Sequence, residues 1–185
     1  MNIGGIILAG GQSKRMGRDK GLTEFNGKLL VEYAIDLLAP HCDGILISTN
    51  SRDYKRFGYP VIKDEIEGIG PAGGILSSLR VTKYDLNIVI SCDMPFLNDK
   101  AVKLLIQNID KDKCIIPVHD GKAEPLFGIY HRNFQRSLSE AIVNNELKMK
   151  KIIGMHGAIF VNFESLLDEY SHLFKNLNFP ADLNR

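Results

Sequence analysis

The chain opens with short apolar runs that alternate with amphipathic segments. In the first run, residues 3–8, apolar and small residues follow one another without polar interruption, a pattern typical of a parallel strand buried on both faces. Apolar residues then recur at helical spacing over residues 29–38, and Pro40 ends that run. The first unit is therefore predicted to be a strand, a long glycine-bearing loop and a helix.

The same alternation continues to about residue 110. It predicts strands at residues 45–49, 61–62 and 87–91, a helix beginning near Pro71, and another helix over residues 99–109. Strands that alternate with helices favour parallel strands joined by right-handed crossovers, with ligands bound outside the carboxyl ends of the strands. The first half of the chain is therefore expected to build a parallel α/β sheet with its ligand site at the carboxyl ends of the strands.

The second half is less regular. Its pattern predicts strands at residues 114–117, 125–130 and 157–163, a helix at 133–143 and a lysine-rich turn at 148–151. Residues 163–174 fit neither pattern clearly, and a short helix is expected at the end of the chain. No repeat, linker or low-complexity segment marks a boundary, so residues 1–185 are expected to form a single domain.

Composition narrows the class of protein. With 185 residues, 44% of them hydrophobic, the chain can fill one core, and a net charge of +1 argues against a broad nucleic-acid interface. No apolar run approaches the ~20 residues that span a bilayer, and no charged leader precedes the first strand, so a cytoplasmic protein without membrane contact is expected. The three widely spaced cysteines are expected to be reduced thiols.

The loop after the first strand carries an unusual density of cations. Residues 8–20 read LAGGQSKRMGRDK, with Lys14, Arg15, Arg18 and Lys20 close together. Glycines allow backbone N–H groups to approach phosphate oxygens, while Lys and Arg neutralise phosphate charge. The loop matches neither G-x-x-x-x-G-K-[ST] nor G-x-G-x-x-G, which argues against a P-loop GTPase and a dinucleotide dehydrogenase. The alternative is a solvated basic loop without a ligand.

A carboxylate follows the strongest predicted strand. Asp93 lies where residues 87–91 end, and Pro95 fixes the turn after it, so its side chain is expected in the ligand crevice. One protein carboxylate together with substrate phosphates and water is enough to hold Mg²⁺. The alternative is a helix N-cap, a role for which Asn98 and Asp99 also compete.

Other candidate residues leave more than one interpretation open. Asp64 ends a strand before a glycine-rich turn, where it could accept hydrogen bonds from a base or ribose. Alternatively, its side chain caps the turn or is exposed to solvent. The glycines at positions 70–74 could admit a purine ring or allow tight packing of a helix on the sheet. Cys92 lacks a neighbouring His or Asn for nucleophilic catalysis, and the five histidines show no zinc-ligand spacing.

Together these motifs resemble the molybdenum cofactor guanylyltransferases. The resemblance rests on LAGGQSKRMGRDKG, Asp64, GPAGG and CDMPF in that order, and on the closing Asn-Leu-Asn-Phe-Pro at residues 176–180. It implies a single-domain, Rossmann-like three-layer α/β/α sandwich with a mostly parallel mixed sheet, similar to the nucleotide-diphospho-sugar transferases. It also implies an Mg²⁺-dependent enzyme that transfers GMP from GTP to molybdopterin, with or without molybdenum, and releases pyrophosphate.

The resemblance also implies roles for individual residues. Arg15, Lys20 and Asp93 would be catalytic, with Arg15 and Lys20 on the triphosphate and Asp93 on the metal ion. Asn176 and Asn178 would contact the acceptor substrate. The nucleotide would be bound by Leu8, Ala9, Gly10, Gly11, Lys20, Ser48, Asp64 and Asp93. Asn50 is an alternative to Ser48 for one nucleotide contact, and transient contact with a molybdoenzyme or a cofactor-delivery protein would follow synthesis.

Three other functions remain open at this point. The cytidylyltransferase of the same cofactor typically has LAAG and lacks the aspartate before the loop lysine, so Gly10-Gly11 and Asp19-Lys20 favour guanine over cytosine. Another sugar-phosphate nucleotidyltransferase would share the scaffold. A non-catalytic GTP-binding module is the alternative from a different class, although such a module has no evident need for the carboxylate of Asp93.

Overall fold

The computed structural model describes residues 2–10 and 19–177 of the chain. Its strands are β1 (Ile3–Leu8), β2 (Glu24–Phe25), β3 (Lys28–Leu29), β4 (Gly44–Ser48), β5 (Val61–Ile62), β6 (Leu86–Ser91), β7 (Cys114–His119), β8 (Lys122–Ala123), β9 (Phe127–His131) and β10 (Ala158–Asn162). Its helices are α1 (Leu30–Leu38), α2 (Pro71–Val81), α3 (Asp99–Gln107), α4 (Phe134–Val143), α5 (Met149–His156) and α6 (Glu164–Glu169), with 3₁₀ helices η1 (Lys20–Leu22) and η2 (Arg52–Phe57).

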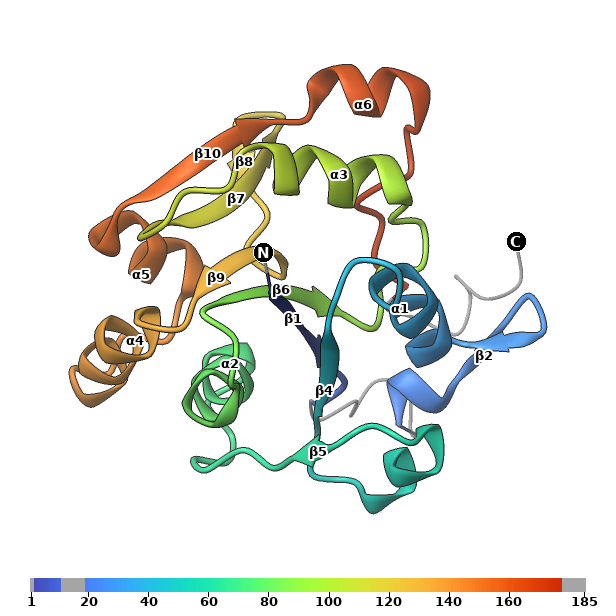
Figure 1. Ribbon diagram of the computed structural model, residues 1–185, viewed down its shortest axis with the longest axis horizontal. Coiled ribbons are helices and arrows are strands. Elements are labelled where there is room, and N and C mark those ends of the chain that lie inside the picture. The colour runs from blue at the N-terminus through green and yellow to red at the C-terminus, as the bar shows by residue number, and fades with distance from the viewer. Residues whose placement is uncertain (1, 11–18, 178–185) are drawn as a thin grey trace.

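One mixed sheet of eight strands forms the middle of the molecule, in the order β10-β7-β9-β6-β1-β4-β5, with β8 paired to β7 (Figure 1). The pairs β6-β1, β1-β4, β4-β5 and β10-β7 are parallel. Strand β9 runs antiparallel to both β6 and β7, and so joins the two parallel parts. The mostly parallel mixed sheet expected from the resemblance is therefore confirmed.

Helices cover both faces of this sheet. On one face, α2, α4 and α5 contribute Ile75, Leu138 and Ile152 to a core that also contains Ile6 of β1. On the other face, α1 packs against β1 and β6 and α3 against β7 and β9, and both helices contribute to a larger core. The central strand β1 is buried along its whole length, which is why its sequence shows no polar alternation. The result is the expected α/β/α arrangement of three layers (Figure 1).

The register of the central strands places their carboxyl ends at one level. Leu8, the last residue of β1, pairs with Ser48 at the end of β4 and with Ser91 at the end of β6. The pairing continues one residue further, because Ala9 N–H donates to the Ser48 carbonyl at 2.9 Å and Cys92 N–H to the Leu8 carbonyl at 3.0 Å. The segments that leave these three strands therefore begin side by side.

The structure departs from the sequence predictions mainly at turns and in the second half. The predicted lysine-rich turn at residues 148–151 is wrong, because Lys148 is the N-cap of α5 and the next three residues are its first turn. The unassigned residues 163–174 contain α6. Two hairpins were not predicted, β2-β3 and β7-β8. The short helix expected at the end of the chain lies outside the described residues.

Across residues 2–10 and 19–177, no helix has both the length and the apolar character needed to cross a bilayer. The three cysteines in this part of the chain are free thiols, as expected. Cys92 and Cys114 are buried, and burial raises the pKa of Cys114 to about 12. Thiols in such an environment are poor nucleophiles.

Gly128 in β9 leaves room for the neighbouring strand β7. A Cβ atom there would lie 2.8 Å from the carbonyl oxygen of Ile115 and 2.9 Å from a side-chain carbon of Ile116. Gly128→Ala is therefore expected to lower the free energy of unfolding by about 1–3 kcal/mol, measured by urea denaturation. Gly154→Ala in α5 is the matched control, because its Cβ would meet nothing within 4 Å, and it should stabilise the protein by up to about 1 kcal/mol. Equal stabilities of the two variants would contradict the packing argument.

Candidate functional site

Asp93 leaves the end of β6 in a short turn, in which Met94 N–H donates to the Ser91 carbonyl at 3.3 Å. The N-cap of the following helix α3 is Asn98, whose side chain accepts a hydrogen bond from Ala101 N–H at 3.1 Å. The capping interpretation of Asp93 is therefore excluded. Its carboxylate lies instead at the edge of the sheet that the strand ends define, where a ligand is expected.

Lys20 and Asp93 form an ion pair at this edge. The Lys20 ammonium group donates to Oδ2 of Asp93, and both side chains are mostly buried, with exposed fractions of 19% and 15%. The other carboxylate oxygen, Asp93 Oδ1, is buried and accepts no hydrogen bond from the residues that the structure describes. A buried carboxylate oxygen without a partner is costly unless something positive occupies its lone pairs, so this atom suits a cation supplied with a ligand.

Within residues 2–10 and 19–177, no group of three or more His, Cys, Asp or Glu side chains forms a ready metal cage. That agrees with the chemistry of Mg²⁺, which takes one or two protein carboxylates and completes its shell with water and phosphate oxygens. Asp93 fits this donor set through its unpartnered oxygen. The metal would then depend on the nucleotide for most of its ligands.

Ser48 and Asp64 lie together on the other side of β1. Ser48 is 2% exposed and its hydroxyl donates to Asp64 Oδ1 at 3.4 Å, while Asp64 N–H donates to the side-chain carbonyl of Asn50 at 3.2 Å. Burial raises the pKa of Asp64, the Ser48 hydrogen bond lowers it, and the charge of Glu67 raises it. Asn50 thus orients the Asp64 backbone, whereas Ser48 acts on its carboxylate.

The glycine-rich turn allows α2 to pack tightly on the sheet. Pro71 opens the helix, and Gly74 is buried in it. A Cβ atom at Gly74 would lie 2.5 Å from Ser48 Oγ and 3.4 Å from Asp64 Oδ1. Glycine at this position therefore leaves space for the Ser48–Asp64 hydrogen bond, which favours the packing interpretation for Gly74.

The end of the described chain folds back onto Asp93. Leu177 N–H donates to the Asp93 carbonyl at 3.0 Å, and the side-chain oxygen of its neighbour Asn176 is buried without a hydrogen-bond partner among residues 2–10 and 19–177. Phe174 stacks on the ring of His119 from β7, with centroids 4.3 Å apart and planes 2° from parallel. Asn176, proposed from the sequence for the acceptor, is therefore close in space to Asp93.

Glu124 extends this region from the turn before β9. Its carboxylate lies 4.0 Å from His119 Nε2. Burial raises its pKa, and the charges of Lys150 and His119 lower it, while that of Asp93 raises it again. These side chains form a polar region on the β7 side of Asp93, opposite the side that holds Asp64.

The structure brings together several residues predicted from the sequence. Leu8 and Ala9 are buried at the end of β1, and Gly10 is exposed immediately after them. Lys20, Asp93 and Asn176 share one edge of the sheet. Ser48 and Asp64 lie across β1 from them. Gly11, Arg15 and Asn178 lie outside the described residues.

Sequence reasoning missed Tyr54, His119, Glu124 and Phe174. One available signal was Asp120-Gly121, a pair that favours a two-residue hairpin and here adopts positive φ angles of 48° and 66°. Recognising that hairpin would have placed His119 at the carboxyl end of a strand. No local pattern marks Tyr54 or Phe174, whose partners are far away in the sequence.

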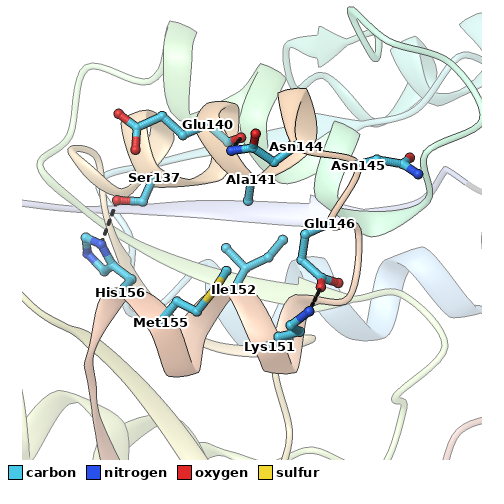
Figure 2. A pocket seen from close by; sticks show the side chains of 10 residues that line it. All are labelled: Ser137, Glu140, Ala141, Asn144, Asn145, Glu146, Lys151, Ile152, Met155 and His156. Carbon is cyan, nitrogen blue, oxygen red and sulfur yellow. Dashed lines mark hydrogen bonds and ion pairs between the residues drawn. The ribbon is translucent and has the colours of Figure 1, made fainter.

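A separate pocket of about 640 Å³ lies between α4 and α5 (Figure 2). Ser137 and His156 close one end with a 2.8 Å hydrogen bond, and Lys151 pairs with Glu146 at the other. It contains none of the residues predicted for the nucleotide or the acceptor. The candidate site is therefore the edge of the sheet around Asp93 and not this pocket.

Similarity to known proteins places the chain in a family. The model of the family described as the MobA-like NTP transferase domain matches residues 5–159. The chain belongs to this family. It is 31% identical to a probable molybdenum cofactor guanylyltransferase of Natranaerobius thermophilus over 100% of this chain and 94% of the relative. It is 36% identical to the molybdenum cofactor guanylyltransferase of Yersinia pseudotuberculosis over 98% and 93%.

Solved structures support the same family and fold. The chain matches molybdopterin-guanine dinucleotide biosynthesis protein A of Archaeoglobus fulgidus with a TM-score of 0.82 and 26% identity, over 98% of this chain and 95% of that one. It matches 2-C-methyl-D-erythritol 4-phosphate cytidylyltransferase of Thermus thermophilus with a TM-score of 0.75 over 99% and 96%, but at 15% identity that likeness concerns the fold alone. The predicted family and fold are thus confirmed, and the protein is a nucleotidyltransferase. Nucleotidyl transfer generally depends on a divalent metal ion.

The Ser48–Asp64 pair generates a prediction about pH. Because the pKa of Asp64 is raised, the folded protein binds this proton more tightly than the unfolded chain, and ionised Asp64 is lost as pH falls through the raised value. Ser48→Ala removes a hydrogen bond that favours the ionised form, so the pKa of Asp64 should rise further. NMR titration of the Asp64 carboxyl carbon measures this directly. Nucleotide contact through the ionised carboxylate is lost as pH falls. In the variant, this loss of GTP affinity should therefore begin at a higher pH than in wild type.

Ser51→Ala is the matched control for this titration. Within the described part of the chain, the Ser51 hydroxyl accepts a hydrogen bond only from the nearby Asp53 N–H, so its removal should leave the pKa of Asp64 unchanged. An unchanged or lower pKa of Asp64 in Ser48→Ala would show that the Ser48 hydroxyl does not stabilise the carboxylate.

Proposed function

We propose that this protein transfers GMP from GTP to molybdopterin, with or without molybdenum, and releases pyrophosphate to form the guanine dinucleotide form of the cofactor. The observation that carries the proposal is the Lys20–Asp93 pair at the carboxyl end of β6, with one carboxylate oxygen left buried and unpartnered. Relatives that bear the name molybdenum cofactor guanylyltransferase along nearly the whole chain support it.

The nucleotide would bind across the end of β1. Backbone groups of residues 8–11 would approach the phosphates, and Arg15 and Lys20 would neutralise the triphosphate charge. Ser48 and Asp64, on the β4 and β5 side, would contact the nucleoside. The partly buried Asp64 carboxylate accepts hydrogen bonds, and guanine offers the donors N1–H and N2–H₂ on one edge, a geometry that cytosine does not present.

Asp93 would hold Mg²⁺ through its free oxygen, as the donor set allows. When bound, such an ion neutralises charge on the phosphate oxygens and on the departing pyrophosphate. The protein's own contribution is to bring two anionic substrates together and to exclude water around them. Lys20, the proposed partner of the triphosphate, and Asp93, the proposed metal ligand, are held next to each other by their ion pair.

The acceptor would approach from the β7 side. A terminal phosphate oxygen of molybdopterin attacks the α-phosphorus of GTP in line, the bond to the β-phosphate oxygen breaks, and pyrophosphate leaves. No covalent enzyme intermediate is needed, so catalysis depends on position and charge more than on a general base. Asn176 and Asn178 would bind the pterin, and Asn176 has a buried oxygen available to accept a hydrogen bond.

The wider biological setting is part of the proposal. All 185 residues would act as one nucleotidyltransferase domain in the cytoplasm, without nucleic-acid or membrane partners. The product would pass to a molybdoenzyme or to a cofactor-delivery protein through a transient contact.

Base selectivity is the direct test of this function. Equilibrium binding of GTP, CTP and UTP, each with and without Mg²⁺, should show tightest binding of GTP and an increase in affinity with Mg²⁺. Tighter binding of CTP would instead favour a cytidylyltransferase on the same scaffold. Selective GTP binding without pyrophosphate release in the presence of molybdopterin would favour a non-catalytic GTP-binding module.

Removal of the Asp93 charge tests the metal assignment. Asp93→Asn keeps the volume of the side chain but weakens its affinity for a cation, so turnover should fall by about 100-fold or more, measured as pyrophosphate release. The neighbouring Asp99→Asn is the matched control, because Asp99 is exposed at the start of α3 and pairs with His41 and Lys103 away from the site. Wild-type turnover by a folded Asp93→Asn variant would exclude the proposed role.

A further inference from the structure

The Tyr54 hydroxyl group lies against Ala9 and Asp19, the described residues near either end of the cationic segment. Tyr54 belongs to η2, far from the loop in sequence, and its side chain is 0% exposed. The hydroxyl donates to Oδ1 of Asp19, and its oxygen also lies 3.5 Å from the carbonyl oxygen of Ala9. Ala9 and Asp19 are the residues on either side of residues 10–18, so one phenol group contacts the polypeptide both before and after them.

Asp19 in turn sets the start of η1. Its carboxylate accepts from Gly21 N–H at 3.2 Å and acts as the N-cap of η1, while its backbone carbonyl accepts from the Thr23 hydroxyl at 3.2 Å. Lys20 is the first residue of that 3₁₀ helix and extends to Asp93. The orientation of Asp19 therefore fixes the backbone from which the Lys20 side chain departs.

Gly21 allows this arrangement to be compact. A Cβ atom at this position would collide with the Tyr54 hydroxyl and would lie 3.2 Å from the sulfur of Cys92. The backbone of η1 therefore rests directly on Tyr54 and on the residue that precedes Asp93. Movement of the Tyr54 hydroxyl would be transmitted to both sides of the Lys20–Asp93 pair.

The ring and the hydroxyl of Tyr54 have separable roles. The ring packs in the apolar core beside Phe57, with centroids 6.0 Å apart, and a phenylalanine ring would fill the same space. Burial, the hydrogen bond to Asp19 and the negative charge of Asp19 raise the pKa of Tyr54 well above its usual value, so it remains a neutral donor. A buried hydroxyl without a hydrogen-bond partner is energetically costly. The hydrogen bond to the Asp19 carboxylate therefore fixes the position of one group relative to the other.

We propose that Tyr54 is a positioning residue for triphosphate binding: through Asp19 it holds Lys20 in the direction in which its ammonium group meets the phosphates. This inference rests on the proposed function. Tyr54 itself touches no substrate, since it is fully buried. It acts indirectly, by restricting the conformations of the backbone that carries Lys20.

The test compares GTP with GMP, which lacks the β- and γ-phosphates. Tyr54→Phe should weaken Mg²⁺-GTP binding by about tenfold and change GMP binding by less than about twofold, measured by calorimetry on the full chain. Tyr130→Phe is the matched control, because Tyr130 is also fully buried and its hydroxyl donates to the Pro125 carbonyl at 2.7 Å, with its ring in the core on the other face of the sheet. It should leave the ratio of GTP to GMP affinity at the wild-type value. Equal losses for GTP and GMP in Tyr54→Phe, or no loss, would overturn the proposal.

A double-mutant cycle distinguishes positioning through Asp19 from a general loss of stability. In an Asp19→Ala background, Tyr54→Phe should change GTP affinity by less than about twofold, because the group through which it acts is gone. Additive losses would overturn the proposed route. The same assay separates the two hypotheses: a wild-type protein that prefers CTP contradicts guanylyl transfer, yet a selective loss of triphosphate affinity in Tyr54→Phe still supports the role of Tyr54. A wild-type protein without affinity for any triphosphate would overturn both.

Discussion

The parallel pairing of β1 with β4 and β6 is the constraint on which the candidate site depends. It places Leu8, Ser48 and Ser91 at one level, so that the three segments leaving these strands start next to one another. The positions of Asp93 and Asp64 follow from this alignment. Asp93 emerges beside the start of the cationic loop, and Asp64 emerges beside Ser48. A shift of one residue in this register would reverse the faces of β1 and bury or expose the wrong side chains.

The site contains buried polar groups whose hydrogen-bonding capacity is not fully used, which is costly for stability alone. Asp93 and Lys20 are both largely withdrawn from water, and the carboxylate uses only one of its oxygens in their pair. Asn176 nearby has a buried oxygen without a partner as well. The two apolar cores on either side of the sheet supply the stability that tolerates these costs. Hydrogen bonds from Tyr54 and Leu177 then hold the polar groups in place.

Much of the first half of the fold could be predicted from sequence because strands buried on both faces leave continuous apolar runs, as in residues 3–8. The positions of Asp93 and Asp64 followed from the same runs, since each is located by the end of a strand. The Lys20–Asp93 pair could not be predicted, because it joins residues 73 positions apart and depends on the register. The β2-β3 hairpin has a local signal in Asn26-Gly27, with φ angles of 49° and 79°, which periodicity alone does not detect.

The antiparallel strand β9 separates two groups of side chains in the order of the sheet. Ser48 and Asp64 come from the β4-β5 side of β1, whereas His119 and Glu124 come from the β7 side beyond β9. The two substrates of a nucleotidyl transfer would thus be recognised by different strands, with Asp93 of the central pair between them. Evolution could then alter the base that is read without disturbing the acceptor, and one sheet could serve a series of enzymes that differ in either substrate independently.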